Sequence, residues 1–188
     1  MELTWIERRL ADRFASGVAS EIAPRAAVAA VLREGARGAE ILFIRRAERS
    51  GDPWSGHMAF PGGRHEAHDA SLLDTALRET REEIGLDLST AGALIATLPD
   101  VPTHKTGLVV RPYVFALRRE HDLALSDEVA EIVWTGVAPL LRGEGAGTFR
   151  YQPEDRDATF VLPCFRVRGH VVWGLTYRML ELLFEALR

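Results

Sequence analysis

Three glutamates in a short charged segment are the residues of this sequence best suited to chemistry. Residues 78–83 read RETREE, which sets Glu79, Glu82 and Glu83 at positions i, i+3 and i+4. In a helix this spacing directs all three carboxylates to roughly one face. Such like charges repel one another, whereas a hard divalent cation such as Mg²⁺ or Mn²⁺ takes oxygen ligands and would hold them together. The spacing therefore points either to a metal site or to a solvated, charged helix face.

The elements that position these carboxylates can be predicted from hydrophobic spacing and from proline and glycine. Residues 71–84 contain neither proline nor glycine and carry an apolar stripe at helical spacing, and Gly85 follows as a stop signal. We therefore expect a helix over this range. Residues 45–59 are rich in glycine, proline and serine, so we expect a loop that leads into Gly62 and Gly63.

The remaining segments predict a mixed sheet with helices packed on it. Apolar spacing indicates an amphipathic helix at residues 3–14 and a closing helix at 177–187. Residues 142–147 are rich in glycine and predict a loop. The expected strands are a hairpin over 26–33 and 41–44, followed by 94–98, 108–117, 129–134, 160–167 and 171–173.

Length and composition limit the class of protein. The chain has 188 residues, 47% of them hydrophobic, which predicts a single domain over residues 1–188. Its net charge of −4 argues against a protein that holds nucleic acid along a basic face. Cys164 is the only cysteine, so no intramolecular disulfide can form and a cytoplasmic location is expected. No apolar run has membrane-spanning length, and we expect no membrane attachment.

Residues 62–86, GGRHEAHDASLLDTALRETREEIGL, resemble the signature of the Nudix hydrolases. That signature runs from a glycine through an acidic residue to arginine, glutamate, a pair of glutamates and a final glycine. Gly63 begins it here, and Arg78, the three glutamates and Gly85 match its second half. The first half departs in two ways, because the acidic residue is Asp69 rather than glutamate and eight residues, not seven, separate it from Arg78.

The chain is more narrowly similar to the coenzyme A pyrophosphatase branch of that family. The branch has a glycine-containing segment that ends in phenylalanine-proline-glycine-glycine, and here residues 56–63 read GHMAFPGG. It also has tryptophan-glycine-x-threonine before the last helix, which residues 173–176 match. Upstream the match is poorer, because Phe43 stands where the branch has threonine and Arg46-Ala47 lies one residue too far away.

The resemblance implies an α/β (α+β) fold, in which a mixed sheet is sandwiched between helices, and cleavage of a diphosphate linkage. Glu79, Glu82 and Glu83 would bind Mg²⁺ or Mn²⁺, and Arg78 would orient them. Glu82, or a carboxylate outside the signature, would activate the water. The substrate would be a small nucleotide, with coenzyme A first among the candidates, and a homodimer is one of the assembly states left open.

Residues outside the glutamate cluster each have two readings. Gly62 and Gly63 either contact metal or phosphate through their backbone or serve the local conformation, and Arg45 and Arg46 either meet phosphate or lie on the surface. Three acidic residues are likewise either further ligands or bases, or part of a solvated surface: Asp127, Glu128 and Glu131. Two tryptophans either stack on a base or pack in the protein: Trp54 and Trp173.

Three other functions compete with coenzyme A cleavage. The first keeps the chemistry and changes the substrate to ADP-ribose or a dinucleotide such as NADH. The second is a noncatalytic Nudix-like regulatory domain, against which the three intact glutamates argue. The third is an isoprenoid diphosphate isomerase, against which the position of Cys164 near the far end argues.

Overall fold

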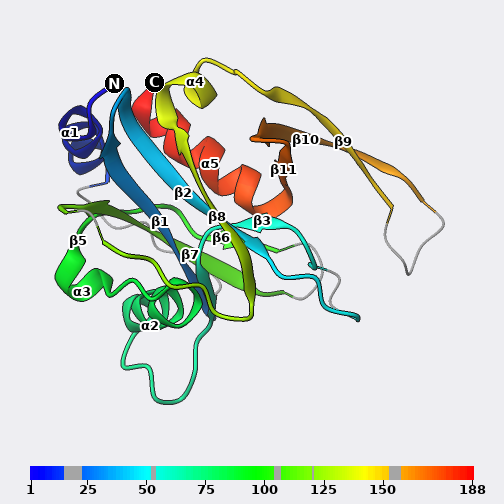
Figure 1. The fold of residues 1–188 in the computed structure, drawn as a ribbon, viewed down its shortest axis with the longest axis horizontal. Coiled ribbons are helices and arrows are strands. Elements are labelled where there is room, and N and C mark those ends of the chain that lie inside the picture. Colours follow the sequence, from blue (N-terminus) through cyan, green and yellow to red (C-terminus); the bar gives the residue numbers. More distant parts are fainter. Residues whose placement is uncertain (15–22, 52–53, 104–106, 120, 153–157) are drawn as a thin grey trace.

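The structure, a computed structural model, describes residues 1–14, 23–51, 54–103, 107–119, 121–152 and 158–188. Within these residues a mixed sheet of eight strands carries helices on both faces, and a smaller sheet of three strands lies beside it (Figure 1). The strands of the main sheet are β1 (Ala26–Gly35), β2 (Gly38–Arg46), β3 (Met58–Ala59), β4 (Gly62–Arg64), β5 (Gly92–Thr97), β6 (Val101–Pro102), β7 (Val109–Leu117) and β8 (Val129–Gly136). The other elements are β9 (Ala146–Tyr151), β10 (Phe160–Val167) and β11 (His170–Trp173), with helices α1 (Leu3–Arg13), α2 (Leu72–Ile84), α3 (Leu88–Ala91), α4 (Val137–Leu141) and α5 (Gly174–Leu187).

Strand β1 is the centre of the main sheet. It forms the predicted hairpin with β2, runs parallel to β7, and pairs antiparallel with the short β4. The β4 pairing sets Gly62 opposite Val28 and Gly63 opposite Ala27. The two glycines before the signature helix are therefore fixed against the most central strand of the sheet.

Both faces of β1 are buried, because successive side chains of a strand point to opposite faces. Val28, Ala30 and their even-numbered neighbours pack toward α1 and α5, and Ala27 and Ala29 pack toward α2 and α3. Figure 1 shows these two helix pairs on opposite sides of the sheet. The predicted fold class, a mixed sheet sandwiched between helices, is confirmed.

Helix α2 begins and ends at the residues that the sequence predicted. The Ser71 hydroxyl oxygen accepts the backbone N–H of Asp74 at 3.2 Å, and the same hydroxyl donates to the Asp74 carboxylate at 2.8 Å. This is a side-chain cap of the N-terminus. Gly85 ends the helix with a φ of +70° and donates its N–H to the Arg81 carbonyl oxygen at 2.9 Å.

Two expected loops contain regular structure. Strand β2 continues to Arg46, and residues 58–59 form β3 on its edge, so the loop expected over 45–59 is shorter at both ends. The prediction of a loop over 142–147 was wrong at its C-terminal end, because Ala146 and Gly147 begin β9 and pair with β10. Among the described residues, no helix has the length and apolar character needed to cross a membrane.

Candidate active site

The four charged residues of the α2 motif differ in exposure. The side chains of Arg78 and Glu83 are buried, with relative exposures of the whole residue of 9% and 4%. The Glu79 side chain is 18% exposed, and that of Glu82 is 55% exposed. Glu79 and Glu83 are therefore the inner glutamates of the motif and Glu82 is the outer one, so the motif is not a uniformly solvated helix face.

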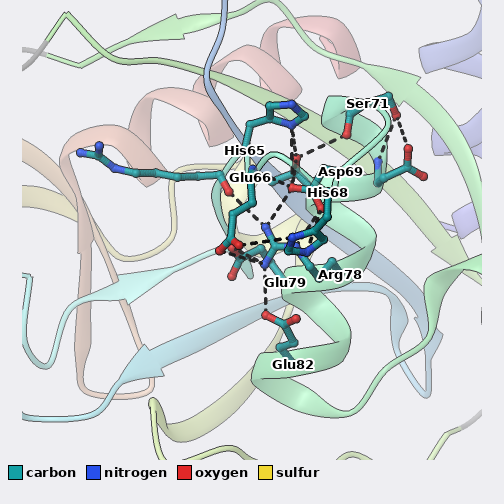
Figure 2. Close-up of polar contacts among 11 residues, drawn as sticks. His65, Glu66, His68, Asp69, Ser71, Arg78, Glu79 and Glu82 are labelled. Carbon is teal, nitrogen blue, oxygen red and sulfur yellow. Dashed lines mark hydrogen bonds and ion pairs between the residues drawn. The ribbon is translucent and has the colours of Figure 1, made fainter.

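The Arg78 guanidinium is the centre of this site (Figure 2). Its Nε and Nη2 bond both oxygens of Asp69 at 2.9 and 3.0 Å, and Nη2 also donates to the Arg64 carbonyl oxygen at 3.1 Å. Its Nη1 donates to Glu79 at 2.9 Å and to Glu82 at 3.1 Å. A guanidinium has five N–H donors, and these five bonds occupy them. Arg78 therefore orients carboxylates and has no donor left for a substrate.

Asp69, the residue that departs from the family signature, holds Arg78 in place. Its Oδ2 accepts the Thr75 hydroxyl at 2.9 Å and the Glu66 backbone N–H at 3.0 Å, and Thr75 in turn lies 3.0 Å from His65 Nδ1. The hydrogen bond with Arg78 holds the pKa of Asp69 well below its usual range, although burial opposes the shift. The shorter side chain and longer spacing thus still deliver a carboxylate to Arg78.

The two glycines of β4 contact the inner glutamates. Gly62 donates its backbone N–H to Glu83 Oε2 at 2.9 Å, and its φ is +150°. A Cβ on Gly62 would overlap the Ala27 carbonyl oxygen, whereas a Cβ on Gly63 would overlap the Glu79 carboxyl group. Gly62 therefore allows close packing of β4 against β1, Gly63 allows close packing of β4 against α2, and Gly62 also supplies a backbone contact to Glu83.

Burial raises the pKa of two of the glutamates, Glu79 and Glu83. It raises the pKa of Glu83 to about 8, against the opposing hydrogen bond from Gly62, and the charge of Glu79 adds to the rise. Burial also raises the pKa of Glu79, and the hydrogen bond from Arg78 opposes that shift. A nearby positive charge, such as a bound divalent cation, favours the charged form of carboxyl groups that repel one another and are shielded from water.

The donor set suits a hard divalent cation, but the side chains have other partners in this structure. In the part of the chain that the structure describes, no three histidine, cysteine, aspartate or glutamate side chains form a group able to hold a metal ion. Glu82 is bonded to Arg78, and Glu83 is bonded to Gly62. The chemistry of three carboxylates on one helix face fits Mg²⁺ or Mn²⁺.

The structure brings one of the two candidate arginines to the glutamates. Arg46 lies close enough to Glu83 for its charge to lower the pKa of that carboxyl group. Arg45, the preceding residue of β2, instead lies 3.7 Å from both Glu131 and Glu48. Consecutive strand residues point to opposite faces, and this alternation explains why Arg46, and not Arg45, lies on the side of the α2 glutamates.

Glu128 is a further carboxylate near the site, and its sequence context is only a weak indication of this. Its charge raises the pKa of Glu83, and its backbone carbonyl oxygen accepts the N–H of Ala47, next to Arg46. Its carboxylate lies 3.1 Å from Arg49, which also bonds Asp127. In the sequence Glu128 is one of three acidic candidates, with Asp127 and Glu131, and is singled out only by its place directly before an apolar strand; its distance from Glu83 depends on the fold.

Comparisons with known proteins agree with this arrangement. Residues 23–153 match the NUDIX domain. Human mitochondrial coenzyme A diphosphatase NUDT8 is 31% identical over 180 residues, which cover 93% of this chain and 75% of the human protein. An uncharacterized protein of Schizosaccharomyces pombe is 40% identical over 111 residues, 55% of this chain and 34% of the yeast protein, so this chain spans only about a third of that relative.

Solved structures show the same fold. The NUDIX domain of Shewanella oneidensis NrtR, in complex with ADP ribose, superposes with a TM-score of 0.54 at 15% identity. The match covers 92% of this chain and 94% of that domain. The domain match, the similarity to the human diphosphatase and the shared fold confirm the resemblance found in residues 62–86, and the chain therefore belongs to the Nudix hydrolase family.

Proposed function

We propose that the chain hydrolyses the diphosphate linkage of coenzyme A or its derivatives, giving 3′,5′-ADP and 4′-phosphopantetheine. The observation that carries the hydrolase part is the group of three glutamates on one face of α2, held by Arg78 and Gly62. Nudix hydrolases generally use divalent cations. We propose Glu79, Glu82 and Glu83 as the ligands of Mg²⁺ or Mn²⁺.

Each residue of the site has a defined part in this proposal. The bound cation would neutralise charge on the diphosphate oxygens and lower the pKa of water. Arg78 fixes the directions of Glu79 and Glu82, and the exposed Glu82 accepts a proton from the attacking water. Arg46 attracts the diphosphate, and the peptide groups of Gly62 and Gly63 line the site. Glu128 is a second candidate for ligand or base.

Two contacts support coenzyme A as the substrate. The two segments that resemble the coenzyme A branch, residues 56–63 and 173–176, are more than a hundred positions apart in the sequence but adjacent in the fold. The Thr176 hydroxyl donates to the Met58 carbonyl oxygen at 3.2 Å, and the His57 and Trp173 rings lie 5.0 Å apart. The similarity to a protein named as a coenzyme A diphosphatase points the same way.

Liquid chromatography of reaction products tests the proposal. The protein would be incubated with Mg²⁺ or Mn²⁺ and, in separate reactions, with coenzyme A, ADP-ribose and NADH. We expect 3′,5′-ADP and 4′-phosphopantetheine from coenzyme A, with much slower turnover of the other two. Faster cleavage of ADP-ribose or NADH would keep the hydrolase and reject the substrate. An absence of turnover with all three would favour the noncatalytic binding domain.

A further inference from the structure

Five ring side chains gather where the small sheet meets the loop before β3. We call this group the aromatic cluster; its members are Trp54, His57, Phe149, Tyr151 and Trp173. The Trp173 ring is central, with centroid distances of 4.5 Å to Tyr151 and 5.0 Å to both Phe149 and His57. Trp54 extends the group, with its centroid 5.9 Å from that of His57. The rings come from three separate segments of the chain.

Part of the aromatic cluster faces solvent. Trp173 is buried, Phe149 and Tyr151 are half-buried, and Trp54 is 47% exposed. Phe149 and Tyr151 stand two residues apart on β9, so they project from the same face of that strand. Packing of the small sheet accounts for the buried ring of Trp173, but it does not require a second tryptophan and a histidine from the loop before β3 to extend outward from that ring.

The aromatic cluster is continuous with the glutamate site through Arg46. The backbone N–H of Arg46 donates to the His57 carbonyl oxygen at 3.0 Å. The alternate residues Leu42 and Ile44 of β2 pack in the core beside α2, so the Arg46 side chain projects from the α2 side of the main sheet. Arg46 and His57 are therefore neighbours across the β2–β3 pair, and a diphosphate attracted by Arg46 would lie next to the His57 end of the aromatic cluster.

We propose that the exposed ring of the aromatic cluster, Trp54, binds the base of the nucleotide substrate by stacking. Every nucleobase has a flat π-face that stacks on aromatic side chains. The cationic Arg46 between the rings and the glutamates suits a ligand whose base is followed by phosphates. This inference rests on the proposed function for its ligand class, a nucleoside diphosphate derivative, and it assigns the base a place in the fold.

Calorimetry with two ligands separates stacking from phosphate binding. ADP and inorganic pyrophosphate share the diphosphate, and only ADP carries a base; each would be titrated in the presence of Mg²⁺. We expect Trp54→Ala to weaken ADP binding about 10-fold and to leave pyrophosphate binding unchanged. Trp54→Phe should restore most of the affinity, since it keeps a ring.

Trp5 supplies a matched control, because it is 41% exposed and lies on α1, away from the aromatic cluster. Trp5→Ala should leave the affinities for both ligands unchanged. Unchanged ADP affinity in Trp54→Ala, or an equal loss for ADP and pyrophosphate, would overturn the stacking inference. A wild-type chain that does not bind ADP would overturn it as well.

Kinetics distinguish failure of this inference from failure of the proposed function. With coenzyme A as substrate, Trp54→Ala should raise KM about 10-fold with kcat within about twofold of the wild type. An unchanged KM beside normal wild-type turnover would reject the stacking and keep the hydrolase. If the wild type does not turn over coenzyme A, the proposed substrate fails, while the ADP titration still decides whether the rings bind a base.

Discussion

At the scale of single residues, the site depends on the buried guanidinium of Arg78, whose N–H donors are all hydrogen-bonded. Arg78 has five hydrogen bonds, two of them to Asp69 and one each to Glu79 and Glu82. Removing one partner of a buried ion pair leaves an unpaired charge, which costs more than the pair itself contributed. The position of Glu79 and Glu82 should therefore depend on Asp69, which touches neither of them.

Replacing Asp69 with asparagine tests that dependence. The amide would turn an N–H₂ group toward donors of Arg78, so we expect kcat to fall about 10- to 100-fold through misplacement of the glutamates. The free energy of unfolding should fall by about 1–3 kcal/mol at pH 7. The measurements are steady-state kinetics and urea unfolding.

The same substitution has a pH dependence of known sign. Arg78 lowers the pKa of Asp69 from its ordinary value of 3.8, so the pair stabilises the fold above about pH 4 and loses this effect as the pH falls further. The difference in unfolding free energy between wild type and Asp69→Asn should therefore be constant from pH 8 to about 5 and shrink below pH 4. A difference that grows in acid would contradict the assignment.

Asp100 provides a matched control for Asp69. It forms a similar bidentate ion pair with Arg111, with hydrogen bonds of 2.8 and 2.9 Å, and its side chain is also buried. Asp100→Asn should lower the free energy of unfolding by a comparable amount while kcat stays near the wild-type value. Equal losses of kcat in the two variants would mean that Asp69 acts only through general stability.

Glu82 is the glutamate whose substitution should separate chemistry from folding. Its side chain is 55% exposed, so Glu82→Gln should leave the melting temperature nearly unchanged. We expect turnover to fall about 10²- to 10³-fold, because the amide is a poor base and a poor metal ligand. Glu144→Gln, an exposed glutamate paired with Arg142, is the control. Near-normal turnover by a folded Glu82→Gln protein would reject the role.

At the scale of elements, the site is made by the close approach of β4 to α2. Gly62 and Gly63 are neighbours in β4, but an added methyl group would meet different atoms at each. At Gly62 the obstacle is the backbone of β1, which is fixed in the centre of the sheet. At Gly63 it is the end of the Glu79 side chain, which can rotate away. The two positions should therefore affect stability and activity differently.

Alanine substitutions at these glycines check this difference. Gly62→Ala should destabilise the fold by about 1–3 kcal/mol, because its φ of +150° disfavours any side chain. Gly63→Ala should change the unfolding free energy much less and reduce turnover at least 10-fold, because Glu79 is displaced. Gly147→Ala, where an added Cβ has open space, should change neither. Full activity of Gly63→Ala would show that the position of Glu79 is not critical.

The elements that the sequence predicted well are those specified by nearby residues. The apolar stripe and Gly85 lie within or next to the helix that they delimit, so the bounds of α2 followed from local spacing. Strand β9 was missed because Gly147 and the glycines just before the strand resemble a loop, and only pairing with β10 makes it a strand. The proximity of Glu128 to Glu83 and the hydrogen bonds between Asp69 and Arg78 likewise depend on contacts that the fold creates.

At the scale of the whole molecule, the glutamate site lies on the side of the main sheet that faces α2, where the packing of α2 brings carboxylates together. Burial raises the pKa of both Glu79 and Glu83, and Glu79 and Glu82 repel each other. Grouping like charges in this way opposes folding when no metal ion is bound. A divalent cation that binds only the folded chain must then stabilise the entire fold.

Thermal unfolding with added metal tests this linkage without relying on turnover. At a Mg²⁺ or Mn²⁺ concentration about 100 times the dissociation constant, the stabilisation should be about 2.7 kcal/mol, which for a chain of this size is roughly 5–10 °C in Tm. A chelator should reverse the shift, and potassium chloride at equal ionic strength should not reproduce it. The combined substitution of Glu79, Glu82 and Glu83 by glutamine should abolish the shift, since it removes the proposed ligands. A shift of the same size in that variant would place the metal elsewhere in the protein.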